Sequence, residues 1–135
     1  MGCSVIDVKK EVERLRASKE EDEQLMLDIL RVLTIFHGRV WESEMLRDLS
    51  KIHGFNISYI PTPSSISRAL ERLKEKGLVE LEERRRGFPL RPGTYIDRMI
   101  ILKNFDEFKE AFSADPIYQG YLYRVHESIR RRLNE

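Results

Sequence analysis

The segment at residues 62–78 constrains the fold more than any other, because it predicts a helix that is followed at once by a strand. Thr62 and Pro63 predict a helix start, because threonine caps free N–H groups and proline fits the first helical position. Over residues 62–76, one helical face is apolar, at Ile66, Ala69, Leu70 and Leu73. Gly77 predicts the end of this helix, and a strand is expected to begin at once with Leu78.

A hairpin is predicted directly after this helix. Residues 78–84 alternate apolar and acidic side chains, which is typical of a half-buried strand. Residues 85–93 contain glycines and prolines and are expected to turn the chain, and residues 94–102 predict a returning strand. Two strands joined in this way form an antiparallel hairpin with a tip of about eight residues.

The residues before Thr62 predict a second, shorter helix. Residues 39–41 are a short apolar step. Residues 42–53 then favour a helix that ends before Gly54 and turns four apolar side chains inward: Met45, Leu46, Leu49 and Ile52. Residues 55–60 contain strand-forming residues, but they lie between two helices and are interpreted as a loop.

Helices are also predicted at both ends of the chain. Ser18 and Glu21 match the capping-box pattern and predict the start of a helix that stops near Gly38. Asn104 is expected to cap a short helix, and Asp115 precedes Pro116 in a second cap-then-proline start. Two narrow apolar stripes accompany these helices: Val5, Val8, Val12 and Leu15 near the N-terminus, and Tyr118, Tyr121 or Leu122, Val125, Ile129 and Leu133 near the C-terminus.

These patterns predict a mostly α-helical fold with a small antiparallel β-hairpin, in the α+β class. The expected organisation has N-terminal helices over residues 1–38, a central unit over residues 39–103 and C-terminal helices over residues 104–135. The central unit resembles a winged helix-turn-helix domain. Its segment from Thr62 to Glu80 resembles the recognition-helix region of MarR-like and PadR-like transcriptional regulators, through Arg68, Leu70, Leu73, Gly77, Leu78 and Val79. The loop at residues 55–60 is longer than the three or four residues usual between these helices.

The distribution of charge favours the same interpretation. The whole chain carries a net charge of only +1, but residues 53–103 carry +4 and residues 84–103 carry +5. Duplex DNA is a dense line of phosphates, and a basic wing beside a recognition helix is its expected electrostatic counterpart. The alternative is that these charged residues form an ordinary solvent-exposed surface that binds no ligand.

The resemblance implies that residues 62–76 enter the major groove of duplex DNA and that a basic wing at residues 84–93 reaches the minor groove or the phosphates. The side chains expected to contact DNA are Ser64, Ser65, Ser67, Arg68, Arg72, Arg84, Arg85, Arg86 and Arg91. In the competing interpretation, Arg68 and Arg72 pair with Glu71 and Glu75 along the helix surface.

The sequence gives little indication of an active site, a cofactor site or a metal site. His37, His53 and His126 lie far apart, no phosphate-cradling loop is present, and the single cysteine, Cys3, excludes an internal disulfide. We therefore expect no enzyme, no cofactor and no metal. Charged residues near the start and the lack of a long apolar run predict a cytoplasmic protein without a membrane span. Scarce Asn and Gln beside abundant Glu, Lys and Arg favour a heat-adapted source.

The predicted function is sequence-specific binding of double-stranded DNA by a dimeric transcriptional regulator. The terminal helices can pack on their own chain or on a second copy, and a homodimer through them would place two recognition helices about one DNA turn apart. Two alternatives stay open: a winged-helix module for protein–protein interaction, and a replication or plasmid-maintenance protein that binds DNA. The sequence does not identify the target DNA or an effector molecule.

Overall fold

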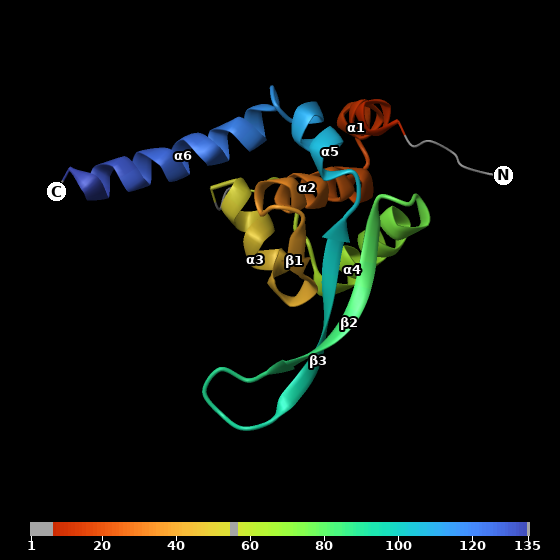
Figure 1. Ribbon diagram of the computed structural model, residues 1–135. Helices are drawn as coiled ribbons and strands as arrows, with labels where there is room; N and C mark the ends of the chain where they lie inside the picture. The colour runs from red at the N-terminus through yellow and green to blue at the C-terminus, as the bar shows by residue number, and fades with distance from the viewer. Residues whose placement is uncertain (1–6, 55–56, 135) are drawn as a thin grey trace.

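A computed structural model describes residues 7–54 and 57–134, and in these residues the chain forms six α-helices and a three-stranded antiparallel sheet (Figure 1). The mostly helical α+β class is therefore confirmed. In chain order the elements are α1 (Val8–Ala17), α2 (Glu21–Ile35), β1 (Arg39–Trp41), α3 (Glu42–Ile52), α4 (Pro63–Glu75), β2 (Val79–Gly87), β3 (Thr94–Leu102), α5 (Phe105–Ala111) and α6 (Pro116–Leu133).

The sheet has one strand more than the sequence predicted. β2 and β3 form the expected hairpin, with Val79 opposite Leu102 and Gly87 opposite Thr94. The short step at residues 39–41 is a third strand, β1, which pairs antiparallel with β3 and gives the order β1-β3-β2. A strand of three residues is too short to show the alternation by which longer strands are found.

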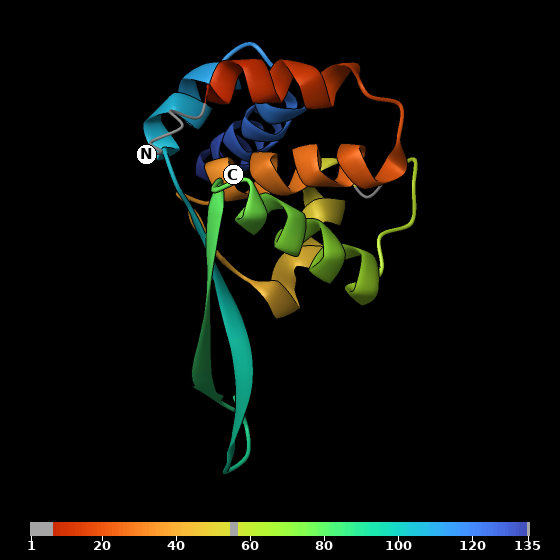
Figure 2. The same ribbon diagram turned by 90° about the vertical axis from the view of Figure 1, so that its right-hand side faces the viewer.

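Helix α2 occupies the middle of the molecule. Its side chains Met26, Ile29, Leu30 and Leu33 are fully buried. Helices α3 and α4 pack on one side of α2, while α1 and α5 lie on the other side together with the start of α6 (Figure 2). One hydrophobic core thus joins the N-terminal, central and C-terminal parts of the chain.

The start and the inward face of α4 are as the sequence predicted. The Thr62 side chain accepts a hydrogen bond from Ser65 N at 3.0 Å, and Ser65 Oγ accepts one from Thr62 N at 2.8 Å. Pro63 occupies the first turn, and Gly77 ends the segment with a φ of 75° that glycine adopts without strain. The four predicted inward residues are buried: Ile66, Ala69, Leu70 and Leu73.

The predicted start of α2 is wrong. Ser18 is the residue that ends α1, and its hydroxyl accepts a hydrogen bond from Glu20 N at 3.2 Å. Glu20 stands at the N-cap position of α2, so the helix begins two residues later than a capping box at Ser18 requires. The hydroxyl serves the turn between the helices instead.

The hairpin extends well beyond the helices (Figure 1). β2 continues to Gly87 and β3 begins at Thr94, so the tip covers residues 88–93 only. The turn predicted to begin at Arg85 therefore begins later, since Arg84, Arg85 and Arg86 all lie on β2. Three consecutive arginines lack the apolar alternation of a strand, but ladder pairing with residues 95–97 of β3 keeps them extended.

The two terminal stripes have different environments. Val8, Val12 and Leu15 of α1 are buried against the chain's own α2 and α5, while Val5 lies outside the described residues. Helix α6 starts at Asp115, whose carboxylate accepts hydrogen bonds from the backbone N–H groups of residues 117 and 118, and then leaves the body (Figure 1).

Within residues 7–54 and 57–134, no helix combines the length and apolar character that crossing a membrane requires.

Candidate nucleic-acid interface

The outward face of α4 presents two of the predicted residues most openly. Ser64 is exposed, and the Arg68 side chain is 64% exposed. Arg68 lies 3.7 Å from Asp22, and Arg72 lies 3.7 Å from Glu23, both at the start of α2. Both arginines therefore form ion pairs with α2. The alternative interpretation, in which they pair with Glu71 and Glu75 along α4, is wrong.

The other two predicted serines on α4 already make hydrogen bonds within the protein. Ser65 belongs to the capping box described above. The Ser67 hydroxyl accepts a hydrogen bond from the Arg98 guanidinium at 3.2 Å. Ser64 and Arg68 are thus the α4 side chains best placed to meet an external ligand.

The register of the hairpin divides the arginine run between the two faces of the sheet. Arg85 is opposite Ile96, and two residues along the ladder Glu83 is opposite Arg98. Because side chains alternate along a strand and cross-strand partners share a face, Arg85 and Arg98 project from the same face. Arg98 contacts α4, so Arg85 lies on the α4 side of the hairpin, whereas Arg84 and Arg86 project from the opposite face.

Arg86 is engaged within the protein. Its guanidinium lies 3.0 Å from Asp97 and 3.4 Å from Glu44, and 4.2 Å from the centre of the Trp41 ring. The hydrogen bond to Asp97 raises the pKa of Arg86, so the residue stays charged. These contacts hold the hairpin against β1 and the start of α3. Arg84 in turn lies 2.6 Å from Glu82 on its own strand.

The tip of the hairpin carries the last predicted arginine. The Arg91 guanidinium stacks on Phe88 at 4.0 Å from the ring centre, and Phe88 packs against Tyr95 with 5.0 Å between ring centres. Leu90 beside it is 99% exposed. Among the described residues, Arg85 and Arg91 are the hairpin cations for which the structure gives no ion pair; Arg85 donates to the Thr94 hydroxyl at 3.0 Å.

Arg98, which was not among the residues predicted from the sequence, joins the hairpin to both helices. It lies 2.5 Å from Glu42 of α3 and 2.8 Å from Glu71 of α4, in addition to its bond to Ser67. The hydrogen bond from Arg98 lowers the pKa of Glu71. A charged pair, Asp97 and Arg98, in the middle of an otherwise apolar strand was the signal that could have identified it.

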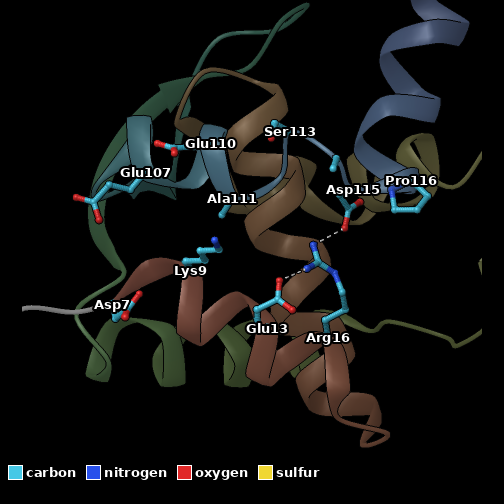
Figure 3. Close-up of a pocket in the computed structure, with 11 residues that line it drawn as sticks. Asp7, Lys9, Glu13, Arg16, Glu107, Glu110, Ala111, Ser113, Asp115 and Pro116 are labelled. Carbon is cyan, nitrogen blue, oxygen red and sulfur yellow. Dashed lines mark hydrogen bonds and ion pairs between the residues drawn. The ribbon is translucent and has the colours of Figure 1, made fainter.

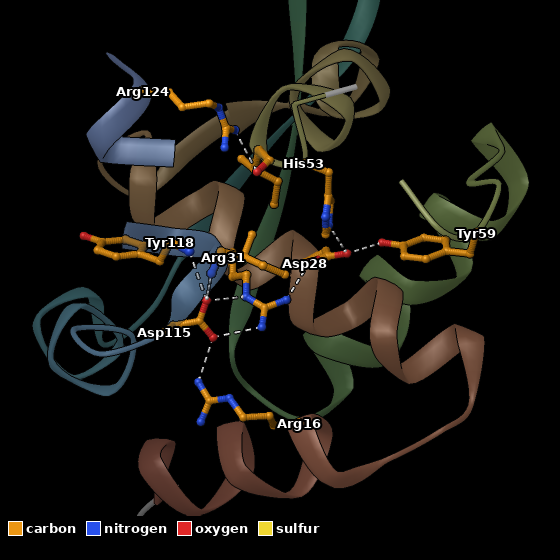
Figure 4. Close-up of polar contacts among 10 residues, drawn as sticks. Arg16, Asp28, Arg31, His53, Tyr59, Asp115, Tyr118 and Arg124 are labelled. Atoms are coloured by element: carbon orange, nitrogen blue, oxygen red, sulfur yellow. Dashed lines mark hydrogen bonds and ion pairs between the residues drawn. The ribbon is translucent and has the colours of Figure 1, made fainter. Parts of the chain in front are cut away.

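A buried polar network holds the segments around α4 in place (Figure 4). In Asp28 of α2, Oδ1 accepts a hydrogen bond from Arg31 at 2.6 Å, while Oδ2 accepts one from the Tyr59 hydroxyl and lies 2.8 Å from Nε2 of His53. Desolvation raises the pKa of Asp28, but the hydrogen bonds from His53 and Tyr59 outweigh it and lower that pKa overall. Because Tyr59 lies in the loop before α4, this network ties that loop to the core.

A groove of about 650 Å³ lies on the far side of α2, between α1 and α5 (Figure 3). Acidic side chains dominate its rim: Asp7, Glu13, Glu107 and Glu110. Within residues 7–54 and 57–134, no three His, Cys, Asp or Glu side chains are grouped closely enough to hold a metal ion.

Comparison with protein-family models, with curated proteins and with solved structures gave no match to this chain.

Proposed function

We propose that residues 21–103 form a winged helix-turn-helix unit that binds double-stranded DNA as a transcriptional regulator. The order α2, β1, α3, α4, β2, β3, with the sheet order β1-β3-β2, supports this assignment. The unit begins with α2, because α2 supplies the core on which α3 and α4 pack. In this proposal α4 is the recognition helix and the β2–β3 hairpin is the wing.

One relationship carries the proposal: the outward face of α4 and the Arg85 side of the hairpin lie on the same side of the molecule. Arg98 projects from the same face of the hairpin as Arg85 and contacts Ser67 and Glu71 of α4. Helices α1 and α5 lie beyond α2 and do not cover this surface (Figure 2). A duplex can therefore meet both elements at once.

The contacts assign different tasks to the predicted residues. Ser64 and Arg68 reach base edges or phosphates in the major groove, and Arg can bind guanine through two parallel donors. Arg85 and Arg91 contact phosphates or enter the minor groove. Arg86 holds the wing against the body of the protein, as its contacts with Asp97 and Trp41 indicate. Arg84 faces away from α4, so its contribution is small.

The test is the salt dependence of binding to a labelled duplex, measured by fluorescence anisotropy. Each phosphate contact steepens the slope of log affinity against log salt by about 0.9. We expect Arg85→Ala/Arg91→Ala to make the slope shallower by about 2 per protomer. Arg84→Ala is the control for the loss of a hairpin charge, because it removes one arginine next to Arg85 but on the opposite face, and it should leave the slope nearly unchanged. Absence of binding by the native chain at low salt would overturn the proposal.

A protein-binding module is the second candidate, and one observation favours it. A cleft of about 470 Å³ separates the hairpin from the starts of α3 and α4, and exposed apolar residues line it, among them Leu46 and Ile96. Glu42 and Glu83 add negative charge to this cleft, which a phosphate backbone would not favour. Binding of a protein partner that Ile96→Glu abolishes, with no affinity for duplexes, would establish this function instead.

A further inference from the structure

Helix α6 carries an apolar stripe that its own chain covers only at the start. Tyr118 is 7% exposed and packs on Phe112, with 6.2 Å between ring centres. The later residues on the same face are all exposed, with 39% at Leu122, 38% at Val125, 51% at Ile129 and 80% at Leu133. Residues at this spacing share one side of a helix, so the stripe continues past the edge of the molecule.

The first turns of α6 fix its direction. Tyr121 packs edge-on against Phe36 at 6.0 Å, and the Arg124 guanidinium donates hydrogen bonds of 3.1 Å to the carbonyl groups of Lys51 and Ile52. The exposed half of α6 is therefore held in place by an anchored half (Figure 1). A helix of this length is marginal in water unless its apolar face is covered.

The two ends of α6 carry opposite charge. Its last turns contain Arg130, Arg131 and Arg132, and in the described residues only Arg130 has an acidic partner, Glu127 at 3.5 Å. The corner where α5 meets α6 is acidic: Glu107 and Glu110 are exposed, and they line the groove in Figure 3 together with Pro116 at the start of α6. The ends are separated by about 27 Å of helix, so they cannot meet within one chain.

We propose that α6 pairs antiparallel with α6 of a second copy of this chain, around a twofold axis near Val125. In this register Val125 meets its own counterpart, and Leu122 lies opposite Ile129 of the second copy. Leu133 reaches the start of the second copy's α6. The arginine-rich end of each helix then lies beside the acidic α5–α6 corner of the other copy. Opposite charges therefore meet at both ends of the interface. Such an interface is closed and isologous.

This pairing assigns the dimer contact to α6 and leaves α1 within its own chain. It does not depend on DNA binding, because none of its residues belongs to the α4 or hairpin surface.

Cysteine cross-linking tests the register. In a Cys3→Ser background, we expect Val125→Cys to form a disulfide-linked dimer on mild oxidation, because only a residue on the axis meets itself. Leu133→Cys places the two thiols at opposite ends of the interface, so no cross-link is expected. Cross-linking of both variants would show a parallel arrangement, and a monomer in sedimentation with cross-linking of neither would exclude the pairing. Either result overturns the proposal.

Charge variants test the two components of the interface in solution. Val125→Glu/Ile129→Glu places like charges together and should weaken dimerisation by roughly 100-fold or more. Tyr123→Glu, on another side of α6, is the matched control and should leave the dimer intact. Glu107→Arg/Glu110→Arg should weaken the dimer, and Arg131→Glu/Arg132→Glu in the same chain should restore it. Circular dichroism checks that each variant is folded, and a dimer that binds no DNA would sink only the proposed function.

Discussion

Arg98 on β3 lies 2.8 Å from Glu71 on α4, and the neighbouring residue Asp97 accepts a hydrogen bond from the hydroxyl of Ser43 at the start of α3. Consecutive strand residues project from opposite faces, so these two side chains hold the hairpin to both helices at once. The angle between the hairpin and α4 is therefore set by side-chain contacts in the middle of the hairpin. The backbone hydrogen bonds between β2 and β3 hold the two strands of the hairpin together, but they do not fix that angle.

Replacing Arg98 with alanine should destabilise the fold. The Arg98 side chain is only 23% exposed, and its loss leaves Glu42 and Glu71 without their partner. We expect the free energy of unfolding to fall by about 1–2 kcal/mol, as measured by urea titration. Arg68→Ala is the control on the other flank of α4. Its ion pair is long and exposed, so its loss should cost less than about 0.5 kcal/mol. Equal losses in the two variants would contradict the bridging role of Arg98.

Arg86→Ala should be visible in the fluorescence of Trp41, the single tryptophan of the chain. The Arg86 guanidinium covers the Trp41 ring at 4.2 Å, and its removal exposes that ring to water and to quenchers. We expect a shifted emission maximum and stronger acrylamide quenching. Arg84→Ala removes the same charge from the same face of β2, but Arg84 pairs with Glu82 on its own strand, so the spectrum of this variant should match that of the native protein.

Residues that act locally were predictable from the sequence, and residues that act across the fold were not. Thr62, Pro63 and Gly77 set the limits of α4 through their own backbone preferences, and the structure confirms them. The predicted start of α2 at Ser18 was wrong because a serine before acidic residues fits both a helix start and the turn that ends the preceding helix. Nothing within three residues of Ser18 distinguishes these two roles.

The same distinction holds for the candidate site. The alternation of residues 78–84 predicted β2, but the faces to which Arg84, Arg85 and Arg86 project depend on how β3 pairs with them. Asp28 and Arg31 look like a surface ion pair in the sequence, because they are three residues apart and their other partners, Tyr59 and Asp115, are distant along the chain. Only the packing of α2 against α6 and the loop before α4 brings the partners together.

The adjacent serines of α4 should differ in what their loss affects. Ser65 completes the capping box with Thr62, so Ser65→Ala should lower the free energy of unfolding by about 1 kcal/mol in a thermal melt. Ser64 is exposed on the proposed recognition face, so Ser64→Ala should leave the melt unchanged and weaken duplex binding. A loss of stability for Ser64→Ala that equals that for Ser65→Ala would mean that Ser64 also supports the helix start.

Acid should destabilise the protein through its buried carboxylates. Desolvation raises the pKa of Asp115, but hydrogen bonds from Arg31, from Tyr118 N and from Arg16 outweigh it and lower that pKa overall. In the unfolded chain the carboxyl group titrates near its ordinary value of about 4. Its contribution to stability is therefore complete above that pH and is lost as the pH falls through the lower folded-state value. Urea titrations at a series of pH values should show this decline.

A variant pair assigns the acid-sensitive step to Asp115. The Asp115 side chain is fully buried between Arg31 and Arg16, so Asp115→Asn should lower stability at neutral pH by about 3 kcal/mol. Its stability should then decline less steeply between neutral pH and the acid range, because the titrating group is gone. Asp106→Asn removes an exposed carboxylate of α5 and should keep the native pH dependence. An unchanged pH dependence in Asp115→Asn would shift the acid sensitivity to Asp28, which shares Arg31 with Asp115.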